Sequence, residues 1–250
     1  MRYHIDTIPV WDAIKTACDC PLCLLWRQVE EKSVTFFNGA SVMEPDIRIQ
    51  VNHEGFCAHH QQALYEQKNR LGHALMMLSH AQETLEQIKQ MESSSRSAVK
   101  SRFGGFGKSK AASGGNTVSS GLSRISESCI ICRQIDENFQ SYLYTFIHLY
   151  KTDAAFVKAF SDSKGLCIPH AAVLLNAAQS ELSGEQFTAL QSLLLEKIRL
   201  NLEKTIEDLD FFTRKFDYRN ADLPWGNSKD ANERTINLIN GHCIGTVKTK

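Results

Sequence analysis

The sequence lacks any apolar run that approaches the roughly 20 residues a membrane helix needs. Its first residues lack the basic start and the continuous apolar stretch of a secretory signal. Charge of one sign is missing too, because 28 Lys and Arg residues balance 28 Asp and Glu residues. A balanced charge indicates neither a nucleic-acid nor a membrane partner. These absences predict a cytoplasmic protein that binds no membrane.

Common catalytic motifs are also missing. The chain contains no G-x-S-x-G, no HExxH and no paired carboxylates in a motif. The stretch GGFGKS at 104–109 approaches a phosphate-binding loop, but Arg102 stands where that motif requires glycine. No motif therefore predicts an enzyme. One enzymatic alternative is a site between two parts of the chain, near Tyr218, Arg219 and Trp225.

Cysteine, in contrast, is abundant for a chain of 250 residues. In a reducing compartment, clustered cysteines bind metal or carry out redox chemistry more often than they form disulfides. The eight cysteines are Cys18, Cys20, Cys23, Cys57, Cys129, Cys132, Cys167 and Cys243.

The cysteines follow a duplicated pattern. A C-x-x-C occurs as CPLC, ending at Cys23, and again as CIIC, ending at Cys132. Each is followed by a helical stretch and then by G-[F/L]-C-x-x-H, as GFCAHH and as GLCIPH. The interval from Cys23 to Cys57 is 57 − 23 = 34 residues, and that from Cys132 to Cys167 is 167 − 132 = 35. This agreement predicts two similar halves in tandem, related by a pseudo-twofold axis.

Thiolate and imidazole are the donors that zinc prefers, four at a time in a tetrahedron. Helix N-termini favour the thiolate form of cysteine, and positions i and i+3 share a helix face. We therefore expect one closed Cys3His site in each half, and two zinc ions in all. The predicted ligand sets are Cys20, Cys23, Cys57 and His60 in the first half, and Cys129, Cys132, Cys167 and His170 in the second. The alternatives are an iron–sulfur cluster, a redox dithiol without a surrounding βαβ pattern, and buried reduced cysteines without metal.

Three residues compete for a role at these sites. Cys18 could replace Cys20 or lie beside the first site as a free thiol. His59 adjoins the predicted ligand, but Pro169 stands at the matching position of the second copy, so the repeat does not select His59. Cys243 is a lone thiol in the C-terminal tail.

The remaining pattern predicts a mainly α fold. Apolar residues recur at spacings of three, four and seven along the chain, and no alternating run indicates a sheet. We expect a helical half at 1–92, a flexible Ser/Gly/basic linker at 93–128, a second helical half at 129–218, and a segment at 219–250 that packs on the helices before a tail.

The two C-x-x-C motifs, GFCAHH, GLCIPH, and the stretch FDYRN followed by LPWG together resemble an uncharacterised bacterial family, the domain of unknown function DUF 6062, common in clostridia. The resemblance covers most of the chain apart from the linker. It implies an intracellular bacterial protein and supplies no activity.

Three hypotheses about function remain. The first is a zinc-stabilised helical binding or scaffold protein with an unidentified protein partner, which could itself be a second copy of the chain. The second is a thiol-based redox or metal sensor that uses Cys18 or Cys243. The third is the enzyme near Tyr218, Arg219 and Trp225. A nucleic-acid partner is not expected, because the long helical span between the ligand pairs is unlike a short zinc finger.

Overall fold

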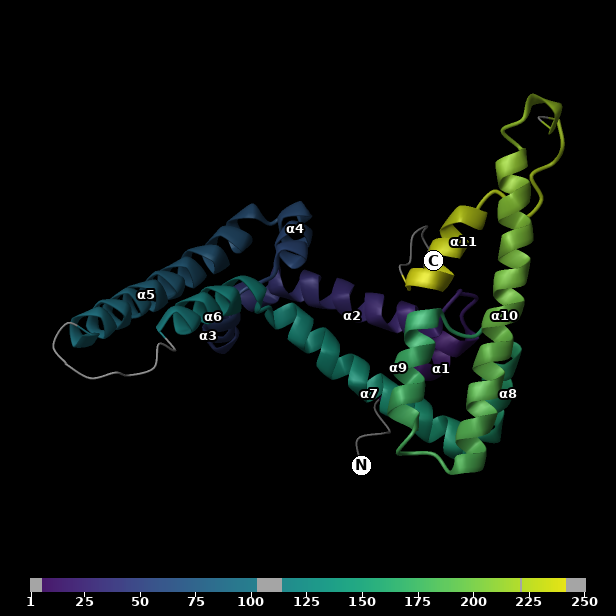
Figure 1. The fold of residues 1–250 in the computed structure, drawn as a ribbon, viewed down its shortest axis with the longest axis horizontal. Helices are drawn as coiled ribbons and strands as arrows, with labels where there is room; N and C mark the ends of the chain where they lie inside the picture. The colour runs from purple at the N-terminus through teal and green to yellow at the C-terminus, as the bar shows by residue number, and fades with distance from the viewer. Residues whose placement is uncertain (1–5, 103–113, 221, 242–250) are drawn as a thin grey trace. The chain divides into compact units, whose positions relative to one another are not determined.

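The structure, a computed structural model, describes residues 6–102, 114–220 and 222–241. Over these residues all regular secondary structure is helical and there is no strand, which confirms the predicted mainly α class (Figure 1). The α-helices are α1 (Thr7–Lys15), α2 (Pro21–Phe37), α3 (Pro45–Glu54), α4 (Ala58–Glu66), α5 (Arg70–Arg102), α6 (Gly114–Glu127), α7 (Ile130–Thr152), α8 (Ala154–Asp162), α9 (Ile168–Ala178), α10 (Gly184–Arg214) and α11 (Ala231–Asn240). Two short 3-10 helices are η1 (Ala40–Met43) and η2 (Tyr218–Asn220).

The chain divides into two compact units. Unit 1 comprises Met1–Val29 and Glu137–Lys250, and unit 2 comprises Glu30–Asp136. Each unit therefore combines segments from both expected halves, 1–92 and 129–218. The divisions fall inside α2 and inside α7, which have no glycine or proline after their first residue. The sequence carries no breaker there that could have indicated a boundary.

Aromatic packing forms the centre of unit 1. The Phe146 ring lies 5.0 Å from both Phe156 and Phe160 in edge-to-face geometry, and Trp11 packs on Phe156 at 5.2 Å. Helix α10 adds Leu190, which is fully buried. Such rings bury large apolar areas and prefer these edge contacts. Figure 1 shows α11 lying alongside α10.

The segment predicted as a flexible linker, 93–128, is helical at both ends, because α5 continues to Arg102 and α6 begins at Gly114. Residues 103–113 lie outside the described part of the chain. Within this segment, Gly121 lies at a close contact between two helices. A Cβ there would come within 2.6 Å of Met91 Sδ on α5. The serine hydroxyls of the segment can donate to carbonyls of their own helix. Such bonds are made by Ser93, Ser94, Ser95 and Ser126.

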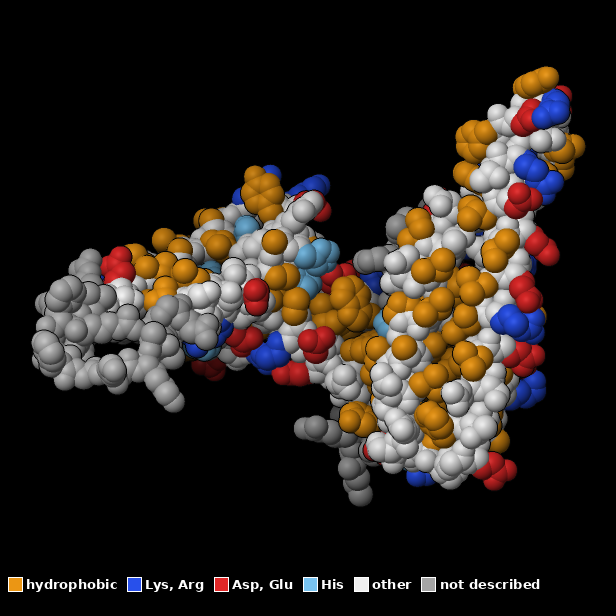
Figure 2. Space-filling model, in the orientation of Figure 1, with side chains coloured by type: hydrophobic (Ala, Val, Ile, Leu, Met, Phe, Trp, Pro, Cys, Tyr) orange, Lys and Arg blue, Asp and Glu red, His pale blue; other side chains and the backbone are white. Residues whose placement is uncertain are grey.

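The apolar side chains of α5 divide between a buried and an exposed face. One face packs inward in unit 2, with Met76 fully buried. The other face exposes Leu71, Leu78 and Leu85, with Leu71 at 72%. Figure 2 shows hydrophobic side chains gathered along this helix. Within the described residues, no helix has both the length and the apolar character that crossing a membrane requires.

Candidate metal centres

The eight predicted ligand residues gather in two clusters. In each cluster, four donor atoms lie within 4.8 Å of one another. Cluster 1 consists of Cys20, Cys23, Cys167 and His170, all in unit 1. Cluster 2 consists of Cys57, His60, Cys129 and Cys132, all in unit 2.

The predicted pairing was wrong. Each cluster combines the C-x-x-C of one sequence half with the C-x-x-H of the other, whereas we expected both motifs from the same half. The reason is that the two copies have nearly identical spacing, so either pairing satisfies the sequence. The choice depends on which helix starts the fold brings together, and the local pattern carries no information about that.

Four helix N-termini present the donors. Cys57 and Cys167 are the N-cap residues of α4 and α9, with nearly equal backbone angles of φ −68°, ψ 166° and φ −67°, ψ 160°. His60 and His170 are the third residues of the same helices, where a side chain faces the N-cap. In both helices the Sγ to Nδ1 distance is 3.3 Å. The C-x-x-H motif is thus a helix start that brings sulfur and imidazole together.

The C-x-x-C motifs use the same position. Cys20 immediately precedes α2 and Cys129 immediately precedes α7, and the second cysteine of each pair is the third helical residue. At α7 the backbone N–H of Cys132 donates to Cys129 Sγ over 3.5 Å. Each cluster therefore sits at two helix N-termini, whose partial positive charge stabilises thiolates.

A glycine precedes each C-x-x-H for a conformational reason. Gly55 has φ +68° and Gly165 has φ +90°, a backbone region that L side chains rarely adopt. A Cβ would also come within 2.6 Å of the His80 ring at Gly55, and within 2.9 Å of the Lys197 stem at Gly165. The glycines therefore allow the chain to turn sharply into α4 and α9.

The distances within cluster 1 fit a central cation. His170 Nδ1 lies 3.5, 3.2 and 3.3 Å from the sulfurs of Cys20, Cys23 and Cys167. One ring nitrogen has a single proton or lone pair, so it cannot bond three sulfurs. A zinc tetrahedron with bonds of about 2.3 Å to sulfur and about 2.0 Å to nitrogen has edges of about 3.5 to 3.8 Å. The separation of 3.6 Å between the sulfurs of Cys23 and Cys167 matches such an edge.

Cluster 2 has the same dimensions. His60 Nδ1 lies 3.3 Å from the sulfurs of Cys57 and Cys129 and 3.4 Å from that of Cys132. The sulfurs of Cys57 and Cys132 are 3.7 Å apart. The donors of both clusters therefore have the type, number and spacing of a closed tetrahedral metal site.

Without a cation, the sulfurs of a cluster compete for charge. Burial, with a contribution from Cys167, raises the pKa of Cys20 to about 12. Burial and the neighbouring Cys129 raise the pKa of Cys132 as well. In cluster 2, burial opposes ionisation of Cys129, but contact with His60 outweighs it and lowers its pKa to about 6. A bound cation would remove this competition by stabilising all three thiolates together.

Glu30 is a residue of cluster 2 that sequence reasoning missed. Its Oε1 lies 3.4 Å from Nε2 of His60, the ring nitrogen that faces away from the sulfurs, and 2.7 Å from Nε2 of His59. Contact with His60 holds the pKa of Glu30 below its usual range, although burial opposes the shift. No motif in the sequence pointed to Glu30, because it reaches His60 only through the fold. His59 thus lies beside the cluster and does not face its sulfurs.

Cys18, Arg219 and Trp225 are not members of either cluster. Burial raises the pKa of Cys18 to about 11, and its thiol lies 3.8 Å from the carbonyl of Ala13. Cys243 lies outside the described residues. Arg219 is paired with Asp217, and Trp225 packs on the ring of Phe212. The side chains of Arg219 and Trp225 are therefore engaged in local packing at the end of α10.

Fold and clusters together define a class: an all-helical protein, within its described residues, that carries two Cys3His clusters at paired helix N-termini. The chain belongs to the family described as "Family of unknown function (DUF6062)", which matches residues 1–246. No curated protein and no solved structure matches the chain.

Proposed function

We propose that the protein is a helical binding or scaffold protein stabilised by two structural zinc ions. The convergence of four protein donors on one point, in each cluster, carries this proposal. Because all four positions of each tetrahedron are filled by side chains, neither site leaves a position for water or substrate. Iron–sulfur ligation is the alternative chemistry for the same donors.

In each cluster the zinc would connect two halves of the chain. Two ligands come from 1–92 and two from 129–218, so the sites would act as cross-links between distant segments. Such a cross-link stabilises the fold by the free energy of metal binding. A pseudo-twofold relation between the two halves would explain why, in both clusters, the C-x-x-C of one half meets the C-x-x-H of the other.

An exposed apolar surface supports a partner. Leu71, Leu78 and Leu85 recur every seven residues along α5, which is the spacing of one helix face. Apolar side chains exposed along one helix face are a feature of interaction sites when they form a larger patch. A second copy of the chain is one such partner. A reducing cytoplasm is the proposed location, because zinc binding requires free thiols.

A thiol-based sensor is the second candidate, and one observation favours it. Cys57 and Cys132 are only half-buried, so oxidants could reach cluster 2. Cys18 fits this role poorly, because its buried thiol remains protonated at neutral pH. The sensor would therefore act through ligand cysteines of cluster 2.

Elemental analysis tests the main proposal. We expect about two zinc ions per chain, loss of helical circular dichroism when a strong chelator removes them, and recovery when zinc is returned. The variant Cys18→Ser is the control and should retain both ions. Purified protein that stays fully folded without metal would refute the structural role. Bound iron together with inorganic sulfide would show that the sites hold iron–sulfur clusters instead of zinc.

A further inference from the structure

We propose that Glu30 is the positioning residue of cluster 2, which holds His60 in the tautomer that binds metal through Nδ1. The inference rests on the proposed metal site and goes beyond it by assigning a role to a residue that is not a ligand. It also makes the two clusters chemically different.

The imidazole of His60 has two distinct faces. Nδ1 lies 3.3 to 3.4 Å from three sulfurs, so it is the metal-binding nitrogen. Nε2 is buried and makes no close hydrogen bond among the described residues. The Glu30 carboxylate oxygen at 3.4 Å is positioned to accept the Nε2–H proton. A proton on Nε2 leaves the lone pair on Nδ1, which is the form a metal requires.

Glu30 is itself held in place. His59 lies 2.7 Å from the same carboxylate oxygen, and the Glu30 side chain is only 18% exposed. A carboxylate behind a ligating histidine fixes the ring orientation and raises the basicity of the ligand. His59, which the sequence offered as a competing ligand, thereby supports the carboxylate.

Cluster 1 provides the contrast. Glu30 stands seven residues after Cys23, and the residue seven positions after Cys132 is Phe139. Beside His170 the structure places the ring of Phe139, at 5.1 Å between ring centroids. Cluster 1 therefore has an aromatic ring beside its histidine where cluster 2 has a carboxylate. Asp136, an exposed carboxylate on α7, serves as a control, because removing its charge should change neither cluster.

The test compares Glu30→Ala, Glu30→Gln and Asp136→Asn in the full-length protein. Zinc affinity at each cluster is measured by competition with a chromophoric chelator. Glu30→Ala should weaken one of the two sites about 10- to 100-fold. Glu30→Gln should weaken it less, because its amide oxygen still accepts a hydrogen bond. Asp136→Asn should change neither site.

A second measurement separates positioning from general damage. Side-chain ¹⁵N spectra of the zinc-loaded protein should show the His60 Nε2–H protected from solvent exchange in the wild type and exchanging freely in Glu30→Ala. Unchanged zinc affinity and an unchanged His60 signal in Glu30→Ala would overturn the inference while leaving the zinc sites intact. A wild-type protein without zinc would instead refute the proposed function. A third zinc equivalent, lost in both Glu30→Ala and His59→Ala, would also overturn it, because Glu30 would then be a ligand.

Discussion

Clusters 1 and 2 are built from the same four-residue set in different surroundings. In cluster 1 all three cysteines are buried, and the carbonyl of Gly241, at the end of α11, lies 3.2 Å from Cys23 Sγ. In cluster 2, Cys57 and Cys132 are half-buried, and the histidine has a carboxylate behind it. Ligand type thus sets the chemistry of binding, whereas the surrounding side chains set access and exchange. We expect cluster 1 to be the more inert site.

The largest expected effect tests which motifs share a cluster. The double variant Cys23→Ser/His170→Ala removes two donors from cluster 1 and should retain one zinc ion. The matched variant Cys23→Ser/His60→Ala removes one donor from each cluster and should retain none, after dialysis against a chelator strong enough to empty three-donor sites. Zinc per chain is measured by elemental analysis. If Cys23→Ser/His60→Ala retained one zinc ion and Cys23→Ser/His170→Ala retained none, each cluster would instead take all its ligands from one sequence half.

The next prediction concerns access to the two clusters. In the metal-loaded protein, Cys57 and Cys132 should react with an alkylating reagent about tenfold faster than the cysteines of cluster 1, because reaction requires exposure and local opening. Peptide mapping by mass spectrometry measures the order in which the cysteines are alkylated. Cys18 is the internal control, since it should stay unmodified without being a ligand. Earlier reaction of Cys20 or Cys23 would contradict the comparison.

Replacing Gly55 and replacing Gly165 should lower the free energy of unfolding by different amounts. Both Gly55→Ala and Gly165→Ala place a Cβ at positive φ, which costs about 1 to 2 kcal/mol. Gly55→Ala should cost more, because the Cβ meets the His80 ring, which the Asn52 carbonyl holds at 2.9 Å, whereas the Lys197 stem can yield. Denaturant unfolding measures both.

The control for the glycine pair is Gly184→Ala, at the first residue of α10. A Cβ there meets nothing within 4 Å. This variant should leave the free energy of unfolding unchanged or raise it slightly, because alanine favours a helix more than glycine does. Equal losses at all three glycines would contradict the conformational argument.

Sequence reasoning identified the helical class and all eight cluster residues, because both depend on local signals. A C-x-x-C or C-x-x-H places its two donors at one helix start, and the repeat selects His60 over His59. The exchanged pairing depends on contacts between residues far apart in the chain, such as Cys129 with His60, 69 residues apart, and Cys23 with Cys167, 144 residues apart. Glu30 and Gly241 also reach the clusters through the fold, since Glu30 lies 60 − 30 = 30 residues from His60 and Gly241 lies 218 residues from Cys23, so no local motif marks them.

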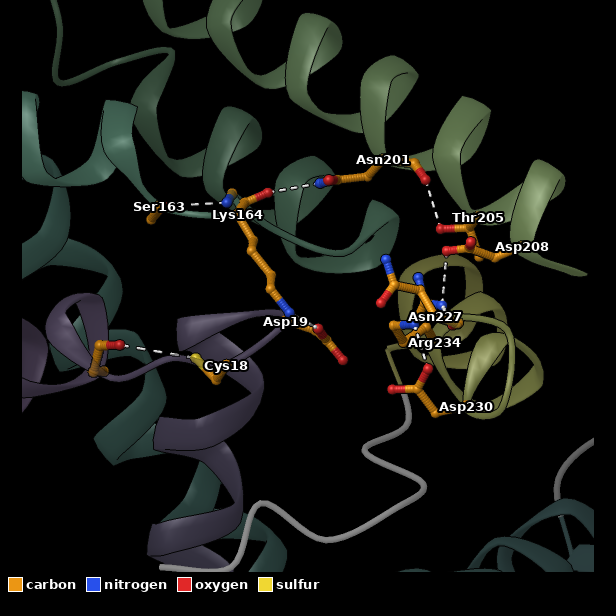
Figure 3. A network of polar contacts seen from close by, with 12 residues as sticks. Cys18, Asp19, Ser163, Lys164, Asn201, Thr205, Asp208, Asn227, Asp230 and Arg234 are labelled. Carbon is orange, nitrogen blue, oxygen red and sulfur yellow. Dashed lines mark hydrogen bonds and ion pairs between the residues drawn. The ribbon is translucent and has the colours of Figure 1, made fainter. Parts of the chain in front are cut away.

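The smallest expected effect concerns an ion pair beside each cluster. Arg133, next to Cys132, binds Glu54 through two hydrogen bonds of 2.8 and 2.9 Å. Lys164 reaches Asp19, next to Cys20, at 2.8 Å (Figure 3). Each pair joins the C-x-x-C segment to the segment before G-x-C-x-x-H, so each cluster has an ion pair at the equivalent place.

Both pairs are partly solvent-exposed, and such pairs contribute about 0.2 to 1 kcal/mol. Lys164→Gln should lie at the low end of this range, because the Lys164 carbonyl still accepts a hydrogen bond from Asn201 at 2.7 Å. Arg133→Gln should lie at the high end, because it loses a bidentate contact with the Glu54 carboxylate. Double-mutant cycles with Asp19→Asn and Glu54→Gln measure each pair, and both variants should keep two zinc ions. A loss of zinc in either variant would mean that the ion pair, and not only the ligand set, determines metal retention at that cluster.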